Sequence, residues 1–443
     1  MNRGDGGCYT TFARKTSINF VIPPVCTNFA INMRNTSLRR MLPAIVPALC
    51  FSLLGTTALA QTASESPATD SIVSVVGDSV HVPASDSAHI PQKRSFIRRA
   101  VDYFFRSNKD TGKKFDFGVL PGPHFSSTAG LGLGVVATGV YSMDRSDTAL
   151  PKSNVAIYGD MTTKGFLMIG VKGNNIFPKK KYRLDYRLYI YTFPTDFWGV
   201  GFDNGKIDSN ETSYRRIRFD AMARFMFRVA PDMYLGPVVN YQYVQARDID
   251  AAGLHLFRGE GLTQQARTVG LSYTYDTRDF ILNAYRGWFV QLDQTFTPRF
   301  LGNDYCYSST ELTASTYRKV WKGGILAGEL HSRFNYGNPG WSMMCDVGST
   351  SRMRGYYEGR YRDKNIIEAQ VELRQHVWKR NGIVVFAGVG QVFPKFDAMR
   401  WNRILPNGGF GYRWEFKHRV NVRVDCGFTR EGAGFMFNIN EAF

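Results

Sequence analysis

The sequence predicts an all-β fold, a transmembrane antiparallel β-barrel of about 16 strands preceded by a short periplasmic segment that carries one helix. Three observations predict it. Segments of ten or more residues alternate apolar and polar side chains, an export leader lies near the amino end, and the chain after that leader has no apolar stretch long enough to cross a membrane as a helix. A membrane protein without such helices satisfies its backbone hydrogen bonds between the strands of a closed sheet.

The leader lies within residues 33–60. Basic residues come first (Arg34, Arg39 and Arg40), an apolar stretch follows from residue 41 to 54, and Ala58-Leu59-Ala60 precedes Gln61. This order of basic, apolar and small-x-small segments is typical of a secretory signal peptide. We therefore expect residues 1–60 to be an upstream extension plus a signal peptide, with Met33 as the start and cleavage between Ala60 and Gln61.

Residues 61–112 predict a linker and a short helix. The first part is rich in Ser, Ala, Asp and Pro and has too few large apolar residues to bury a core, so we expect it to be disordered. Further on, Ile97, Val101 and Phe104 share one helical face beside several arginines. Such a helix fits either the membrane surface or the mouth of the barrel.

The predicted barrel comprises residues 113–443. The clearest strand is 367–377, where Glu368, Gln370, Glu372 and Arg374 alternate with apolar residues. A period of two is the signature of a strand with one polar and one apolar face. About 16 such segments follow one another. The long connections 195–210, 250–266, 338–364 and 395–402 all fall on one side of the predicted barrel, and short turns fall on the other, which is the pattern of bacterial outer-membrane barrels.

Composition limits the partners and the chemistry. Removal of residues 1–60 lowers the formal net charge from +18 to +13, and the cations are spread through alternating segments. We therefore expect contact with outer-membrane lipids and lipopolysaccharide, and no nucleic-acid binding. The mature chain keeps only Cys306, Cys345 and Cys426, which have no metal-ligand spacing and predict no disulfide framework. Neither a His-Glu-x-x-His pair nor a Gly-x-Ser-x-Gly turn occurs, so we expect no catalytic residues, metal or cofactor.

Four motifs occur in order along residues 113–443. They are an opening strand with Gly118-Val119-Leu120-Pro121; a strand-and-turn motif with Asp276, Arg278, Asp279 and Gly287; a loop signature with Arg354, Gly355, Tyr356, Gly359 and Arg360; and a closing strand with Phe435, Phe437, Ile439 and Phe443 that ends the chain. Together they resemble the motifs of the BamA/TamA family of outer-membrane insertases, also called bacterial surface antigens, and the resemblance covers about residues 113–443.

The resemblance implies that Arg354 folds back into the lumen and pairs with an acid on the next strand. By position that acid is Glu372, with Glu368 on the same polar row as the competing partner. Two departures from the family stand out. Gly388 occupies a place where the family often has a further acid, which predicts a reduced pairing network. Residues 61–114 also hold no pattern of the periplasmic substrate-binding (POTRA) domains.

The function implied by the resemblance is the insertion or translocation of proteins at the bacterial outer membrane. Clients and accessory proteins would meet a lateral seam between the first and last strands. Pro121 and Pro123 on the first strand lack backbone donors, and Gly432 and Gly434 begin the last strand, so the residues themselves predict a weak seam. The alternative is a passive structural barrel, channel or anchor that kept the fold without insertase activity, and the missing POTRA pattern favours that alternative.

Overall fold

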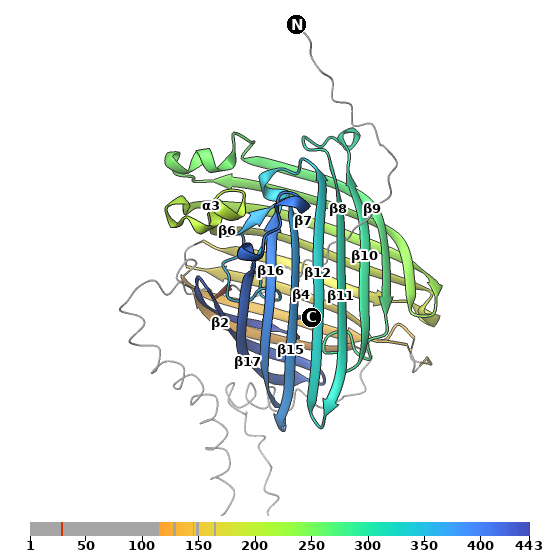
Figure 1. The fold of residues 1–443 in the computed structure, drawn as a ribbon. Coiled ribbons are helices and arrows are strands. Elements are labelled where there is room, and N and C mark those ends of the chain that lie inside the picture. The colour runs from red at the N-terminus through yellow and green to blue at the C-terminus, as the bar shows by residue number, and fades with distance from the viewer. Residues whose placement is uncertain (1–27, 30–114, 127–129, 145, 148–149, 164) are drawn as a thin grey trace, which may run out of the picture. The chain divides into compact units, whose positions relative to one another are not determined.

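The computed structural model describes residues 28–29, 115–126, 130–144, 146–147, 150–163 and 165–443. Sixteen long strands form one antiparallel sheet, which confirms the predicted fold class (Figure 1). The predicted leader, its cleavage site at Ala60 and Gln61, the linker and the amphipathic helix lie outside the described residues. The long strands are β2 Phe115–Ser126, β3 Gly130–Tyr141, β4 Ser153–Thr162, β5 Leu167–Ile176, β6 Tyr182–Phe197, β7 Thr212–Ala230, β8 Met233–Arg247, β9 Thr263–Asp276, β10 Gly287–Thr297, β11 Tyr307–Trp321, β12 Gly324–Gly337, β15 Asn365–Trp378, β16 Asn381–Phe393, β17 Leu405–Lys417, β18 Val420–Thr429 and β19 Gly432–Ile439.

The two rows of side chains on each strand separate as the alternation predicts. On β5, Leu167 and Ile169 point outward and are about half exposed, whereas Met168 between them is buried. On β15, Val371 is exposed on the outer face and Glu372 is fully buried on the inner face. The apolar row therefore faces outward and the charged row inward, the reverse of a soluble barrel and the arrangement that a lipid environment favours.

Connections of two kinds join the strands. One end of the sheet, here called the loop end, carries the long connections 198–211, 248–262, 298–306, 338–364 and 394–404. The other end, here called the turn end, has the tight turns 231–232, 322–323, 379–380 and 418–419, together with the longer connections 142–152 and 277–286. The asymmetry that the sequence predicts is present, although those two turn-end connections are longer than expected.

The loops contain short strands, one short α-helix and several 3-10 turns. The connection between β12 and β15 contains a two-stranded ribbon, β13 Cys345–Asp346 and β14 Arg362–Asp363. The only α-helix in the described part of the chain is α3 Phe202–Lys206, and none of the helices there is long and apolar enough to cross a membrane. The 3-10 turns are η2 Pro178–Lys180, η3 Asp208–Asn210, η4 Ala251–Phe257, η5 Arg299–Leu301, η6 Trp341–Met343, η7 Phe396–Ala398 and η8 Trp401–Arg403.

The two ends of the sheet lie side by side without a shared ladder. Within the described residues, β2 is registered with β3, and β19 is registered with β18 and with the two-residue strand β1 Asn28–Phe29. Lys417 Nζ of β17 donates to the Phe117 carbonyl of β2 at 2.9 Å. A Cβ on Gly122 would lie 3.3 Å from the Phe437 ring of β19. Side-chain contacts therefore join the two edges, and within the described residues no ladder of registered pairs joins β2 to β19.

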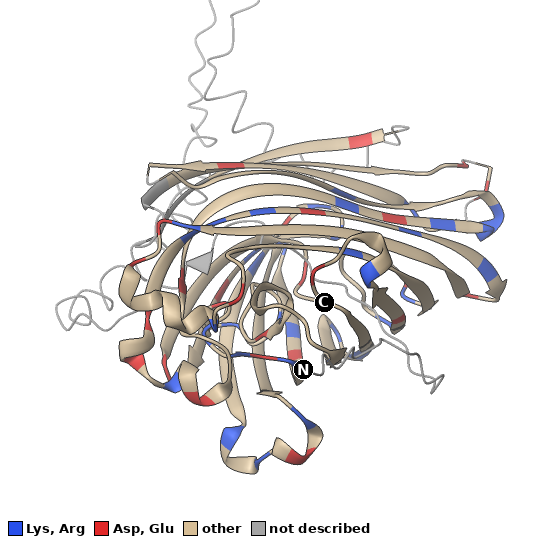
Figure 2. Cartoon of the chain, turned by 90° about the horizontal axis from the view of Figure 1, so that it is seen from above, with Lys and Arg blue, Asp and Glu red and all other residues tan. Residues whose placement is uncertain are grey.

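The interior is polar and charged. Seen from above, Lys, Arg, Asp and Glu occur on the same strands and do not gather in one patch (Figure 2). Buried arginines are paired with buried acids on neighbouring strands, for example Arg187 with Asp220 at 2.6 Å. Pairing of this kind offsets the large cost of removing each charge from water.

Candidate functional site

The long connection 338–364 folds into the interior and brings Arg354 to its centre. The Arg354 side chain is fully buried. Its Nη2 lies 2.5 Å from Glu372 Oε1 on β15, and its Nη1 donates to Asp425 Oδ2 on β18 at 2.9 Å. The guanidinium also stacks 3.6 Å from the centre of the Phe386 ring on β16. The structure thus brings together Arg354 and Glu372, the pair that the family resemblance implies.

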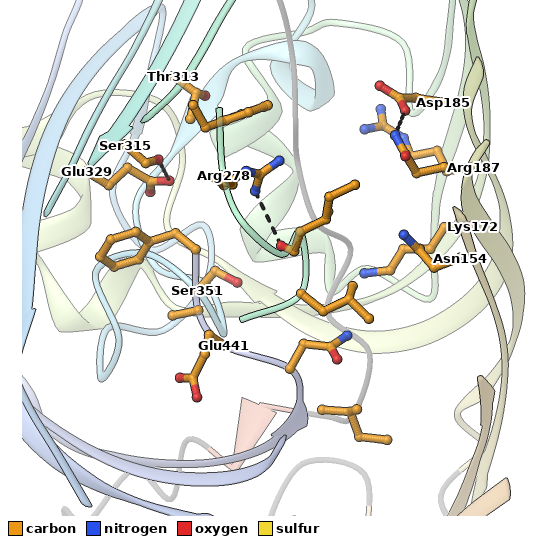
Figure 3. Close-up of a pocket in the computed structure, with 18 of the residues that line it drawn as sticks. Asn154, Lys172, Asp185, Arg187, Arg278, Thr313, Ser315, Glu329, Ser351 and Glu441 are labelled. Atoms are coloured by element: carbon orange, nitrogen blue, oxygen red, sulfur yellow. Dashed lines mark hydrogen bonds between the residues drawn. The ribbon is translucent and has the colours of Figure 1, made fainter. Parts of the chain in front are cut away.

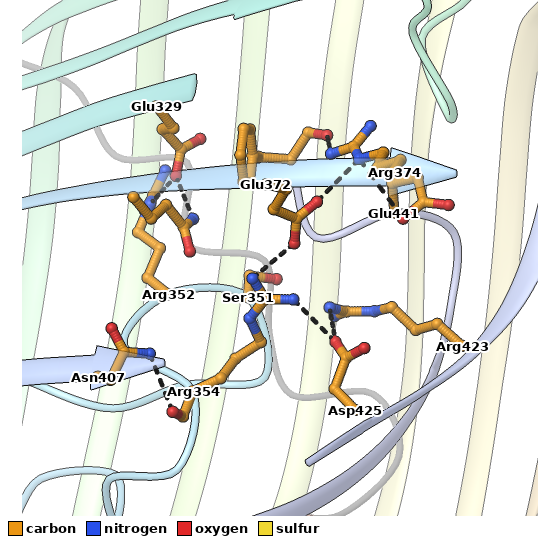
Figure 4. A network of polar contacts seen from close by, with 12 residues as sticks. Glu329, Ser351, Arg352, Arg354, Glu372, Arg374, Asn407, Arg423, Asp425 and Glu441 are labelled. Carbon is orange, nitrogen blue, oxygen red and sulfur yellow. Dashed lines mark hydrogen bonds and ion pairs between the residues drawn. The ribbon is translucent and has the colours of Figure 1, made fainter. Parts of the chain in front are cut away.

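These contacts extend into a closed ring of six side chains, here called the ionic ring. Glu372 pairs with Arg374 at 2.8 Å, and Arg374 lies 3.8 Å from Glu441. Glu441 pairs with Arg413 at 2.8 Å, and Arg413 pairs with Asp425 at 2.5 Å. Asp425 contacts Arg354 and so closes the ring (Figure 4). Cations and anions alternate around the ring, so each buried charge has two partners of opposite sign.

The ionic ring corrects one expectation. A reduced network was predicted because Gly388 replaces a family acid, and that prediction is wrong: Asp425, two strands further along the sheet, supplies a second acid. Arg423 adds a further contact to Asp425 at 3.0 Å. The signal was present in the sequence, since Arg423 and Asp425 alternate with valines on the polar row of β18. Alternation shows which face they occupy, but it does not show which group they meet across the interior.

Glu368, the competing partner, has other contacts. Its Oε1 lies 2.7 Å from His331 Nδ1 and 3.8 Å from Arg352 Nε. Arg352 in turn pairs with Glu329 at 2.6 Å. The two acids on the polar row of β15 therefore hold two different arginines of the same loop.

Glycines allow the loop tip to approach the strands. Gly355 has a φ of +106°, a region that residues with a Cβ rarely adopt. A Cβ at Gly355 would lie 2.8 Å from the Gly427 backbone of β18. A Cβ at Gly434 of β19 would lie 2.9 Å from Gly355 Cα. Gly434, predicted as part of a weak seam, therefore faces the interior and leaves room for the loop tip.

The rest of the loop signature fixes the base of the loop. The Tyr356 hydroxyl donates to the Pro406 carbonyl at 2.9 Å. Burial, with the nearby Glu431 carboxylate, raises the pKa of Tyr356 to about 12, so this donor keeps its proton at neutral pH. Gly359 has a φ of +85°, and Arg360 donates to the Gly205 carbonyl at 2.9 Å and to Asp208 at 2.7 Å. These bonds join the loop to the connection that contains α3.

The strand-and-turn motif lies at the turn end. Arg278 Nη2 and Arg183 Nη1 contact Asp276 at 2.8 and 2.9 Å. Asp279 accepts from the Tyr285 backbone N–H at 2.9 Å and pairs with Arg419 of the β17–β18 turn at 2.8 Å. Gly287 has a φ of +111°, and a Cβ there would lie 2.4 Å from the Thr277 carbonyl oxygen. Connection 277–286, which joins β9 to β10, therefore contacts the β17–β18 turn far along the sheet.

The closing strand differs from its prediction. It was expected to run to Phe443, but β19 ends at Ile439, and Asn440 follows with a φ of +71°. This turn directs Glu441 to Arg413 and leads Phe443 into the interior. There the Phe443 carbonyl accepts from Arg374 Nη2 at 2.9 Å, and its ring lies 5.2 Å from that guanidinium. Phe435, Phe437 and Ile439 remain on β19, whereas Phe443 is an interior contact and not a strand residue.

The remaining predicted seam residues lie at the edges of the sheet. Pro121 is exposed on the outer face of β2 and is registered with Val135 of β3, as Pro123 is with Leu133. Gly432 begins β19 with a φ of +142° and has open space around its Cα. In the described part of the chain, no group of three or more His, Cys, Asp or Glu side chains could hold a metal ion.

Comparison with known proteins identifies the family. The model of the Omp85 superfamily domain matches residues 173–420. The chain belongs to the Omp85 superfamily. No curated protein matches the sequence. A superfamily domain of this kind, on a sheet with an apolar outer face, makes the chain an outer-membrane β-barrel.

Solved structures with a similar fold include two kinds of protein. BamA from Haemophilus ducreyi, lacking POTRA domains 1–3, is 11% identical with a TM-score of 0.47, over 73% of this chain and 69% of that one. CdiB from Escherichia coli is 12% identical with a TM-score of 0.47, over 74% of this chain and 62% of that one. The chain thus spans less than two thirds of the length of that CdiB. The described residues of this chain comprise the sheet and its connections, and none of them forms a POTRA domain.

Proposed function

We propose that this Omp85 barrel assists the insertion or translocation of proteins at the outer membrane, through lateral opening between β2 and β19. The observation that carries the proposal is the pair of edges that lie side by side without a ladder. Opening a sheet along an ordinary ladder breaks a backbone hydrogen bond at nearly every residue. Here no such ladder joins β2 to β19 within the described residues, and the contacts to be broken include side-chain contacts such as those of Lys417 with Asp116 and Phe117.

A sheet edge without a full ladder also offers a template for an incoming strand. Free N–H and C=O groups on an edge strand pair readily with another chain. β19 already accepts a second partner, because Met436 and Phe435 are registered with Asn28 and Phe29 of β1. If the leader is removed at Ala60, residues 28–29 leave with it, and this part of the β19 edge becomes available.

The rest of the barrel is suited to hold its form while the seam opens. The ionic ring ties the loop tip to β15, β17 and β18 on one side of the seam. The alternative function, a passive barrel or anchor, is favoured by the absence of a substrate-binding domain from the described residues. The two functions differ in whether the seam must open.

A disulfide across the seam tests the proposal. In a background with the native cysteines replaced by alanine, Gly122→Cys with Phe437→Cys would link the two edges. We expect the oxidised protein to lose assisted insertion of a labelled barrel client into liposomes, and reduction to restore it. The control pair, Leu235→Cys with Tyr273→Cys, links residues that already face each other in the β8–β9 ladder. Equal activity of the oxidised seam variant and the oxidised control would contradict the proposal and favour the passive barrel.

A further inference from the structure

The interior contains a cavity of about 210 Å³ between the ionic ring and strands β4–β6. It has room for several water molecules or for a small oxyanion. Lys172 of β5 and Asn154 of β4 line one side of the cavity, and Ser351 of the long loop lies across from them (Figure 3). Arg423 and Asn438 also line the cavity.

The lining has an excess of positive charge. Six cationic and three acidic side chains face the cavity. Each acid is already paired with an arginine: Asp185 with Arg183, Glu329 with Arg352, and Glu441 with Arg413. Each acid of the cavity wall therefore already has a cationic partner.

Lys172 is the exception among the cations of the cavity. The five arginines that line it (Arg183, Arg187, Arg278, Arg352 and Arg423) each form an ion pair with an acid. For Lys172 the described residues supply no anionic partner, only the Tyr158 ring at 5.5 Å and the like charge of Arg423, which repels it. Its ammonium group points into the cavity (Figure 3).

Two further donors in the same cavity lack acceptors. Arg423 Nε and Ser351 Oγ are both buried, and neither has a hydrogen-bond partner within the described residues. Arg423 uses its other nitrogens on Asp425 and on the Thr350 carbonyl. A buried donor without an acceptor destabilises the folded protein, so these two donors, together with the Lys172 ammonium group, favour an acceptor-rich occupant.

We propose that this cavity is a binding site for a phosphate-type oxyanion, held by Lys172, Arg423 and Ser351. An oxyanion supplies the missing negative charge and accepts from all three donors, which water does less well because it carries no charge. Because Ser351 belongs to the long loop, Lys172 to β5 and Arg423 to β18, the bound anion also joins the loop to both sides of the interior.

Phosphate protection against heat tests the site. The protein in detergent micelles is unfolded thermally in sodium phosphate and in sodium chloride of equal ionic strength, with tryptophan fluorescence as the readout. A ligand that binds only the folded state raises the unfolding midpoint. We expect phosphate to raise it and Lys172→Gln to weaken the apparent phosphate affinity about tenfold or more, because a charge-assisted hydrogen bond is lost. Lys172→Arg, which keeps the charge, should retain most of the effect.

The matched control is Lys322→Gln, which removes the same charge from an exposed lysine in the β11–β12 turn. Equal phosphate responses of Lys172→Gln and Lys322→Gln, or equal midpoints of the parent in phosphate and chloride, overturn the proposal. Ser351→Ala removes a neutral donor and should weaken binding about three- to tenfold. The intact mass of protein released gently from membranes then distinguishes the sources: a retained phospholipid that Lys172→Gln loses indicates a lipid phosphate, and no retained lipid indicates a free oxyanion.

Discussion

Two sides of the interior differ in how they use charge. On β15, β17 and β18, the inner row carries Glu372, Arg374, Arg413, Arg423 and Asp425, all buried and all in ion pairs. On β3, the inner row consists of glycine, valine and threonine from residue 132 onward and has no charged side chain. The first side holds the long loop in place next to β19, and the second lies next to β2, on the other side of the seam. The difference indicates that the barrel is rigid on the side where the loop docks and more loosely held on the β2 side of the seam.

Removal of the loop-tip arginine should give the largest effect on this comparison. Arg354→Ala removes one cationic partner from each of Glu372 and Asp425, and breaking a buried ion pair costs about 3–5 kcal/mol of unfolding free energy. Urea unfolding, with heat-dependent gel mobility as the readout, measures this loss of unfolding free energy. The control, Arg403→Ala, breaks an exposed pair with Asp203 and should cost at most about 1 kcal/mol. Similar losses in the two variants would show that the docked loop does not stabilise its side of the barrel.

Gly355→Ala should give the next largest effect. A positive φ at a residue with a Cβ costs about 1–3 kcal/mol, and the contact with Gly427 adds to that cost. Gly259→Ala is the control, because Gly259 also has a positive φ, +70°, but has open space around it. The difference between the two unfolding free energies therefore measures how tightly the loop tip packs on β18. A cost at Gly355 no greater than at Gly259 would mean that the tip is loosely packed.

A double-mutant cycle at Arg354 and Glu372 should show a coupling of about 0.5–3 kcal/mol. The single variants should be similarly destabilised, because each residue has two partners in the ionic ring. Loss of Arg354 takes one cation from Glu372 and Asp425, and loss of Glu372 takes one acid from Arg354 and Arg374. Urea unfolding of the two single variants and the double variant provides the three values. Strictly additive losses would place the stabilisation elsewhere in the ionic ring.

The smallest effect is expected on the loosely held side. Lys417→Met removes the ion pair with the partly exposed Asp116, so the unfolding free energy should fall by about 1 kcal/mol or less. The same change should nevertheless free the edge of β2, which limited proteolysis of the barrel in detergent would detect as faster cleavage near residue 115. Lys319→Met, on the intact β11–β12 ladder, is the control. Equal cleavage rates near residue 115 in the two variants would argue against a side-chain latch at the seam.

The sequence predicted local features of the fold better than side-chain contacts between residues that are far apart in the sequence. Alternation on segments such as 367–377 was enough to place sixteen strands and their two faces, because the period of two depends only on neighbouring residues. The family resemblance supplied the partner of Arg354. Neither the alternation nor the family resemblance could identify Asp425 and Glu441 as members of the ionic ring, because contacts across a wide interior depend on the curvature of the whole sheet. Phe443 was misplaced for a related reason: the interior contacts of Arg374 and the left-handed turn at Asn440 end β19 four residues early.

The ionic ring also has a consequence for the order of assembly. Arg354 and Asp425 are separated by 71 positions, and Lys417 and Asp116 by 301. Contacts between distant positions form late, since the intervening chain must first be brought together. Arg413, Asp425 and Glu441 all come from the last 31 residues of the sequence. The set of partners for the loop tip is therefore incomplete until β17 and β18 have joined the sheet. Docking of Arg354 thus indicates that the carboxy-terminal strands are in place.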